Sequence, residues 1–269
     1  FPISMILYLI DYKKEMMQVK NKKDIIFTPS EINTGVTNGQ QIIITRFEEA
    51  LKTIIHELIH FHDLDFKNVP KFLTDYCLQK FHLEETLKDH FNNPVINLFE
   101  AYTEGYASII NCIYYTYLNP SLEYNLQENT ELKNYEIRIN KYLGQHLTYQ
   151  IAYTMIKCCQ ILNIIGCKDL NQFANNKTLN GNNRTINSNN IKKCKIGLNE
   201  NTNVFSYYFI KLYFYLYLDE LFNNCCQKYN GKFIKNKENY YQLKNIIEKG
   251  RNNKYISDLV ITLQNNLSK

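Results

Sequence analysis

The residues best suited to chemistry form one short pattern, His56-Glu57-Leu58-Ile59-His60, which has the arrangement HExxH. On an α-helix, residues four positions apart lie about one turn apart on the same face, so two imidazoles can hold one metal ion. The glutamate beside the first histidine then lies next to the metal, where it can take a proton from a bound water. The pattern predicts one zinc ion per chain, with His56 and His60 as ligands and Glu57 as general base. The alternative is a pair of ordinary helix histidines.

A catalytic zinc ion needs a third protein ligand and one open position. The metzincin pattern would place a glycine three residues after His60 and a histidine three residues after that, but Asp63 and Phe66 occupy those positions. That pattern is therefore excluded. Four other side chains could serve as the third ligand: His62, Glu84, Glu85 and His90.

The strongest candidate for the third ligand is Glu100, which precedes Glu104 by one helical turn. Such a pair suits a metal ligand followed by a carboxylate that orients a metal-bound histidine. Small residues beside the pair would let its helix approach the HExxH helix closely: Ala101, Gly105, Ala107 and Ser108. The alternative is a solvated glutamate pair on a helix surface.

Together, His56-Glu57-Leu58-Ile59-His60 and Glu100-Ala101-Tyr102-Thr103-Glu104 resemble the gluzincins, the thermolysin-like class of metallopeptidases. Their pattern is HExxH followed by a later helix carrying ExxxD. The resemblance implies that His56, His60 and Glu100 are ligands, Glu57 is the general base, and Glu104 orients a ligand. Glu104 departs from the pattern, which usually has aspartate there, so its hydrogen bond must be made by a longer side chain.

The resemblance covers roughly residues 45–118, and it implies a fold as well as a site. It implies a mixed N-terminal subdomain whose edge strand lines the substrate cleft, with a helical subdomain closing the other side. A peptide or protein substrate would then bind by strand addition to that edge. The candidate edges are Gln40–Thr45 and Glu31–Thr37.

The tetrahedral oxyanion of peptide hydrolysis requires a further hydrogen-bond donor. Gluzincins commonly use a downstream histidine or tyrosine. His146 is the only histidine after His90, so it is the residue predicted for this role, with Tyr149 and Tyr153 one and two helical turns further on. The alternative is an ordinary histidine at the start of a surface helix.

The elements before the HExxH pattern are predicted to be strands. Short apolar runs cover Ile3–Ile10 and Asp24–Thr28. Asn38-Gly39 predicts a type I′ hairpin turn between Glu31–Thr37 and Gln40–Thr45, because both turn residues tolerate a positive φ.

The HExxH pattern itself lies in a predicted helix. Apolar residues recur from Phe47 to His62 at the spacing of one helical face. Thr45, with Glu48 three residues later, predicts a capping box at the start. Periodicity and proline or glycine boundaries predict seven further helical stretches, with a break at Gly144 between the third and the fourth: Pro70 to Phe91, Pro94 to Leu118, Glu131 to Tyr142, His146 to Ile165, Val204 to Tyr229, Lys237 to Lys249 and Tyr255 to Asn266.

These elements predict an α+β, zincin-like fold, in which a small antiparallel or mixed sheet with the active-site helix precedes a mainly helical part. The predicted division places a catalytic subdomain at residues 1–120 and a helical subdomain at 121–269. Within the second part, the Asn-rich stretch 171–203 has no periodicity and predicts a surface loop.

Composition narrows the partners. The chain is 45% hydrophobic and 21% charged, which is typical of a globular protein, and its net charge of +5 is spread out, which argues against a nucleic-acid partner. The apolar run from Val204 to Leu218 is too short for a membrane span. Eight cysteines without CxxC argue against a four-cysteine zinc site and favour free thiols in a reducing, intracellular or virion-associated setting.

Three functions fit this reading. The leading one is a zinc metallopeptidase. The others are a zincin-fold binding module without catalysis and a zinc hydrolase acting on a non-peptide substrate. An intact Glu57 argues against the inactive module, because a protein that only binds has no need of that base.

Overall fold

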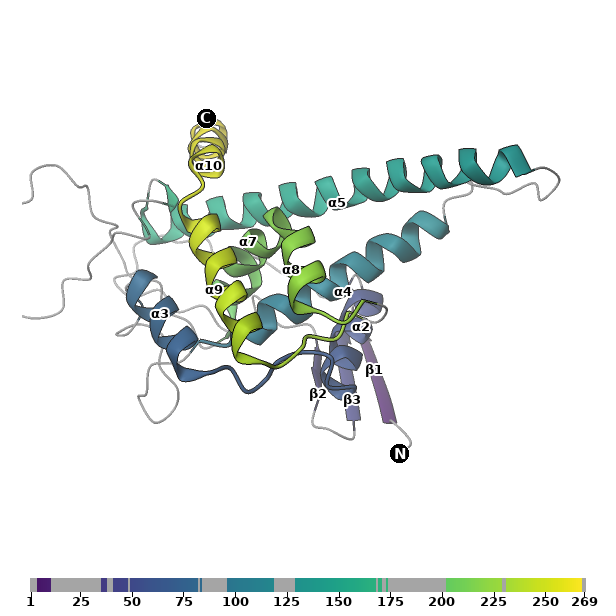
Figure 1. Cartoon of the computed structure of the whole chain (residues 1–269), viewed down its shortest axis with the longest axis horizontal. Helices are drawn as coiled ribbons and strands as arrows, with labels where there is room; N and C mark the ends of the chain where they lie inside the picture. The colour runs from purple at the N-terminus through teal and green to yellow at the C-terminus, as the bar shows by residue number, and fades with distance from the viewer. Residues whose placement is uncertain are drawn as a thin grey trace, which may run out of the picture.

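The computed structural model describes residues 4–10, 35–37, 41–47, 49–81, 83, 96–118, 129–167, 169–170, 173, 202–228 and 231–267. The strands are β1 (Ser4–Ile10), β2 (Gly35–Thr37) and β3 (Gln41–Arg46). The helices, drawn in Figure 1, are α2 (Ala50–Phe61), α3 (Lys71–Phe81), α4 (Leu98–Tyr117), α5 (Asn129–Ile165), the π-helix η2 (Phe205–Ile210), α7 (Lys211–Leu216), α8 (Leu218–Cys225), α9 (Lys237–Arg251) and α10 (Lys254–Leu267).

The sheet is mixed, with strand order β1-β3-β2. β2 pairs antiparallel with β3, and β1 pairs parallel with β3. A two-residue turn at Asn38-Gly39 would place Thr37 opposite Gln40, but Thr37 pairs with Ile42, so the antiparallel pairing is as predicted and the register of the predicted type I′ turn is wrong. Because β3 is paired on both sides, the prediction that Gln40–Thr45 forms the substrate-binding edge is wrong. β2, within the other candidate Glu31–Thr37, is an edge of the described sheet. The predicted strand Asp24–Thr28 lies outside the described residues.

The HExxH helix α2 packs on this sheet. A Cβ at Gly35 of β2 would lie only 2.5 Å from Thr53 Cγ2, so a glycine is what lets the strand approach the helix this closely. The predicted capping box is wrong, because Thr45 belongs to β3, whose ladder continues to Arg46. The helix instead begins after Glu49, which makes no side-chain cap hydrogen bond.

The buried face of α2 is not the predicted apolar stripe. Its buried residues include His56, Glu57 and His60, whereas Phe47 is 68% exposed. The reason is that α2 turns its motif toward α4, so the polar residues enter the interior and the apolar residues cover the sides.

The later helices follow the prediction in part. α3 begins directly after Pro70 but ends at Phe81, and Leu83, inside the predicted continuation to Phe91, is not helical. Pro94 lies outside the described residues, but α4 begins only at Leu98, after the N-cap residue Asn97, so its predicted start is too early. α5 is one continuous helix, so the predicted break at Gly144 is wrong. A glycine in a helix interior costs only about 0.5–1 kcal/mol, too little to interrupt a long helix. The end of α5 at Ile165 is as predicted, and Gly166, which follows it, has a φ of 72°.

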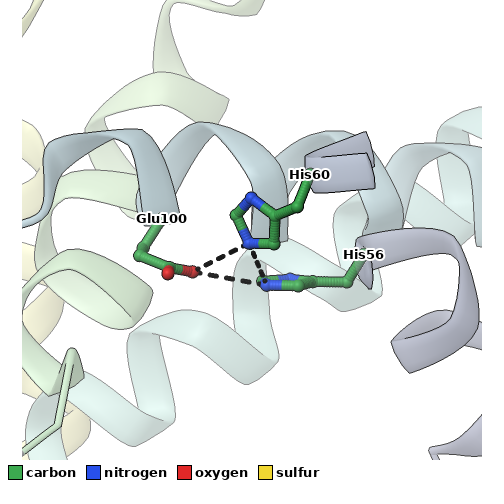
Figure 2. A group of neighbouring side chains, drawn as sticks. All are labelled: His56, His60 and Glu100. Atoms are coloured by element: carbon green, nitrogen blue, oxygen red, sulfur yellow. Dashed lines mark hydrogen bonds and ion pairs between the residues drawn. The ribbon is translucent and has the colours of Figure 1, made fainter. Parts of the chain in front are cut away.

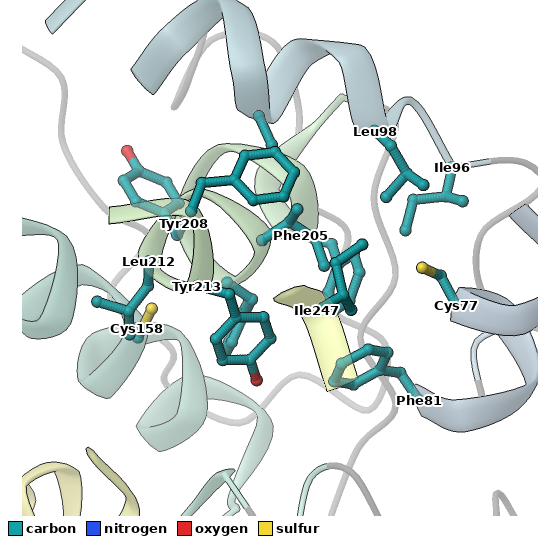
Figure 3. Packing of buried hydrophobic residues seen from close by; sticks show 14 of the residues in the cluster. Cys77, Phe81, Ile96, Leu98, Cys158, Phe205, Tyr208, Leu212, Tyr213 and Ile247 are labelled. Atoms are coloured by element: carbon teal, nitrogen blue, oxygen red, sulfur yellow. The ribbon is translucent and has the colours of Figure 1, made fainter. Parts of the chain in front are cut away.

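The C-terminal run from Val204 is not one helix but three, η2, α7 and α8. It supplies much of a buried aromatic and aliphatic cluster that includes residues of α3, α4, α5, α9 and α10 (Figure 3). Phe173, in the predicted surface loop, is buried and stacks on Phe209, while the loop is otherwise almost entirely outside the described residues. The division into 1–120 and 121–269 stays a prediction.

Two sequence predictions concern the surroundings of the protein. Among the described helices, none has the combination of length and hydropathy that a bilayer span requires. Six described cysteines are free and buried, whereas Cys167 is disulfide-bonded. The six free thiols agree with the predicted reducing compartment, whereas the disulfide of Cys167 does not, so the compartment stays a prediction.

Candidate metal centre

Helices α2 and α4 pack against each other and bring the predicted ligands together. His56 and His60 lie one turn apart on α2, and Glu100 lies in the first turn of α4. Figure 2 shows the two imidazoles and the carboxylate converging on one point from the two helices. Both histidines are buried.

The three facing atoms form a small triangle. His56 Nε2 lies 3.0 Å from His60 Nε2 and 3.3 Å from Glu100 Oε2, and His60 Nε2 lies 3.5 Å from the same oxygen. Ligand atoms about 2.0–2.1 Å from one tetrahedral ion lie about 3.3–3.4 Å apart. The triangle therefore has the size that a zinc ion bound to two imidazole nitrogens and one carboxylate oxygen requires.

The far side of His56 is held by Glu104. Its Oε2 lies 3.2 Å from His56 Nδ1, while its Oε1 accepts hydrogen bonds from Lys52 Nζ at 2.7 Å and Lys211 Nζ at 3.3 Å. With Nδ1 engaged, His56 presents Nε2 to the triangle. Glutamate in place of the usual aspartate thus still reaches the imidazole, as the orienting role requires.

Of the small residues of α4, Gly105 does not fill the role that the sequence analysis expects, which is to let α4 approach α2 closely. A Cβ added at Gly105 would make ordinary contacts with Lys211 and Tyr215 of α7. Gly105 therefore faces α7 rather than α2. The Lys211 side chain that pairs with Glu104 lies on this side of α4, and an added Cβ would not clash with it.

The far side of His60 is held by Asp65, a residue that the sequence analysis does not single out. Asp65 Oδ2 hydrogen-bonds to His60 Nδ1, and the side chain is fully buried. The sequence signal is an aspartate five residues after the second histidine, but only the turn that follows α2 shows that it folds back onto the imidazole.

The site favours positive charge at its centre. Burial opposes charging of His56, but hydrogen bonds with Glu100 and Glu104 outweigh it and raise the pKa of the metal-free imidazole to about 9. Burial likewise opposes ionisation of Glu100, yet its hydrogen bonds with His56 and His60 lower its pKa to about 2. A pocket that stabilises an imidazolium between ionised carboxylates is suited to a cation.

Glu57 is also buried, and burial raises the pKa of its carboxyl. The neighbouring imidazoles of His56 and His60 act in the opposite direction. A carboxylate with a raised pKa is a better proton acceptor near neutral pH, which suits a general base.

Tyr207, on η2, is a second site residue that the sequence did not reveal. Its hydroxyl donates to Glu100 Oε2 at 3.3 Å, and its ring meets the His56 ring edge-on at 6.1 Å between centroids. Tyr207 and Lys211 are four residues apart and face Glu100 and Glu104, which are also four apart. With 22 tyrosines in the chain, no local signal distinguishes this one.

His146 is not among the side chains that the fold brings together here. Its Nδ1 lies 3.0 Å from Thr116 Oγ1, at the far end of α4. At 1.5 Å of rise per residue, Thr116 lies about 18 Å along the helix from Glu104. Tyr149 is 70% exposed, and Tyr153 interacts with Glu49, Lys52 and Glu104 rather than with the ligands.

Among the rival third ligands, His62 is exposed and stacks edge-on against Phe61. Glu84, Glu85 and His90 lie outside the described residues. Within the described part of the chain, Glu100 is the carboxylate that completes a metal-binding group with the two histidines.

Comparisons with protein-family models, with curated proteins and with solved structures find no match to this chain. The resemblance to gluzincins therefore rests on the motif residues and on the geometry of the site.

Proposed function

We propose that this protein is a zinc-dependent metallopeptidase of gluzincin type, with His56, His60 and Glu100 as the metal ligands. The observation that carries the proposal is the triangle of facing Nε2, Nε2 and Oε2 atoms, 3.0–3.5 Å apart. The orientation of both imidazoles by carboxylates on Nδ1 supports it, because such pairs are characteristic of zinc-binding histidines. Three protein ligands leave one position open, as in catalytic zinc sites.

A zinc ion held there would supply Lewis acidity and lower the pKa of a bound water toward ~7. Glu57 accepts the proton of the attacking water and then delivers it to the leaving amine. The Tyr207 hydroxyl, close to Glu100 and His56, replaces His146 as the candidate donor to the oxyanion. Glu104 and its lysine partners keep His56 in the orientation that the metal needs.

The substrate class is a peptide in extended conformation. β3 is unavailable for strand addition because it is paired on both sides, so β2 is the candidate edge. β2 lies next to the motif helix, since Gly35 contacts Thr53 one turn before His56. A strand added there would run close to the ligand-bearing face of α2.

The decisive experiment combines metal analysis with a substrate screen. Protein purified without added metal should contain about one zinc per chain and should cleave members of a mixed peptide library. A chelator should abolish cleavage, and added zinc should restore it. Glu57→Gln, prepared in parallel, controls for contaminating proteases.

Other results would assign other functions. A protein that stays metal-free in excess zinc contradicts the proposal. Stoichiometric zinc with no hydrolysis of any substrate identifies a binding module. Chelator-sensitive cleavage of ester or phosphate substrates, with peptides left intact, identifies a non-peptide hydrolase.

A further inference from the structure

We infer that Asp65 is a positioning residue that holds the His60 imidazole with its Nε2 toward the metal. The inference rests on the proposed zinc site and extends it, because the gluzincin resemblance assigns an orienting carboxylate to Glu104 alone. Each of the two ligand histidines then has its own carboxylate on Nδ1, one from α4 and one from the turn after α2.

The turn after α2 is built to return Asp65 to His60. Asp63 has a φ of 51°, a left-handed conformation that reverses the chain at the end of the helix. The backbone N–H groups of Asp63 and Leu64 donate to the carbonyls of His60 and Ile59, at 3.2 and 3.1 Å. These bonds close the helix end and fix the distance between its last turn and Asp65.

A second set of contacts anchors the turn to the protein interior. Phe66 is fully buried, and its ring lies 4.4 Å from that of Phe233 and 5.6 Å from that of Tyr102. The Phe233 N–H donates to the Leu64 carbonyl at 3.0 Å. Asp65 is therefore held between two anchored neighbours and has little freedom to leave His60.

The contacts of the Asp65 carboxylate indicate that its role is to orient His60. Asp65 is 0% exposed, its Oδ2 bonds to His60, and among the described residues its Oδ1 has no hydrogen-bond partner. Burying a carboxylate is costly unless it is well compensated. A side chain chosen for fold stability alone would not be a carboxylate with one oxygen unsatisfied, whereas orienting a ligand imidazole requires an acceptor at this place.

The test uses Asp65→Ala, Asp65→Asn and a matched control, Asp63→Asn, in the full-length protein. Asp63 belongs to the same turn, but its carboxylate is exposed and pairs with Lys235 at 2.7 Å, away from the histidines. Zinc affinity would be measured by competition with a chromophoric chelator, and ligand geometry by the visible spectrum of the cobalt-substituted protein. Unfolding of the chelated proteins by urea reports on the fold separately.

We expect Asp65→Ala to lower zinc affinity by about 10–100-fold and to change the cobalt spectrum, as is typical when an orienting partner is lost. Asp65→Asn keeps an acceptor for Nδ1–H and should fall between Asp65→Ala and the unchanged protein. Asp63→Asn should bind zinc as the unchanged protein does.

The inference is overturned if Asp65→Asn and any folded Asp65→Ala protein bind zinc and cobalt as the unchanged protein does, even if they unfold more easily. If Asp65→Ala does not fold, the affinity of Asp65→Asn decides the question in the same way. An unchanged protein that binds no zinc instead refutes the proposed function, so the two failures are distinguishable.

Discussion

The two candidate zinc histidines are supported by carboxylates of contrasting origin. Glu104, on His56, comes from a second helix and lies against two lysine ammonium groups. Asp65, on His60, comes from the turn that ends the same helix, and among the described residues its carboxylate hydrogen-bonds to that imidazole and to no lysine. Its neighbour Phe66 packs against Phe233 in the interior.

The difference teaches how two imidazoles on one helix can be fixed by independent means. The His56 support requires α2, α4 and α7 to be assembled, because Lys211 reaches Glu104 from α7. The His60 support is mainly local in sequence, being five residues from its histidine. Loss of the contact between α7 and α4 should therefore affect the first support and leave the second in place.

The largest expected effect comes from Glu100→Ala, which removes the oxygen that both imidazoles face. Glu100 Oε2 lies 3.3 Å from His56 Nε2 and 3.5 Å from His60 Nε2. Elemental analysis should find the protein without stoichiometric zinc, and hydrolysis should be abolished. Glu84→Ala, Glu85→Ala and His90→Ala should retain the metal. If one of these three strips the zinc while Glu100→Ala keeps it, the ligand assignment fails.

Glu57→Gln should leave both supports intact while removing the base. Zinc content should stay near one per chain, and the hydrolysis rate should fall by ~10²–10⁴-fold, because only proton transfer is lost. The ratio of zinc to protein and the turnover rate are measured on the same sample. Activity at the original level would show that another group accepts the proton.

Lys211→Met should weaken the His56 support, because it removes a lysine that hydrogen-bonds to Glu104. The Lys211 side chain is 3% exposed, and its replacement leaves Glu104 with Lys52, at 2.7 Å, as its lysine partner. The free energy of unfolding should therefore fall by about 1.5–3 kcal/mol, the value typical of a hydrogen bond to a charged group. Lys249→Met removes one partner of an exposed pair with Glu220 and should cost only about 0–1 kcal/mol. Equal urea midpoints for the two variants would mean that the buried pair contributes no more than the exposed one.

Glu104→Ala allows the two supports to be compared directly with Asp65→Ala. It should weaken zinc binding by about 10–100-fold without removing any ligand. Chelator competition gives the affinity. If the losses of zinc-binding free energy in Glu104→Ala and Asp65→Ala add up in the variant that carries both changes, the two supports act independently, as their separate contacts suggest. Strong non-additivity would show that they hold the two imidazoles as one unit.

The last expected effect is a dependence on pH, which has opposite signs for the stability of the metal-free protein and for zinc affinity. Hydrogen bonds to Glu100 and Glu104 outweigh burial and raise the pKa of His56 from 6.5 to about 9 in the metal-free protein. Its contribution to stability is complete below pH 6.5 and is lost as the pH rises through 9.

Zinc requires the neutral imidazole, so zinc affinity should instead increase up to about pH 9, by up to about tenfold per pH unit. Melting temperatures of the chelated protein and zinc affinities, each measured from pH 6.5 to 9.5, test both halves. A zinc affinity that does not change over this range would show that no proton is displaced from His56.

The sequence by itself determined the parts of this protein that depend on local spacing. Residues at i and i+4 of a helix share a face in any fold, so His56 with His60 and Glu100 with Glu104 were visible as pairs. Asn38-Gly39 predicted the antiparallel pairing of β2 and β3, because a hairpin turn depends on local backbone conformation, but it did not predict the register, in which Thr37 pairs with Ile42.

Only the tertiary structure decided which distant groups complete those pairs. Tyr207 and Lys211 reach α4 from more than one hundred residues away in the chain, and nothing in their neighbourhood separates them from other tyrosines and lysines. His146 had a suitable side chain but lies beside Thr116 instead. Even the contact between Asp65 and His60 depended on the left-handed conformation of Asp63, which an aspartate tolerates but which the sequence does not dictate.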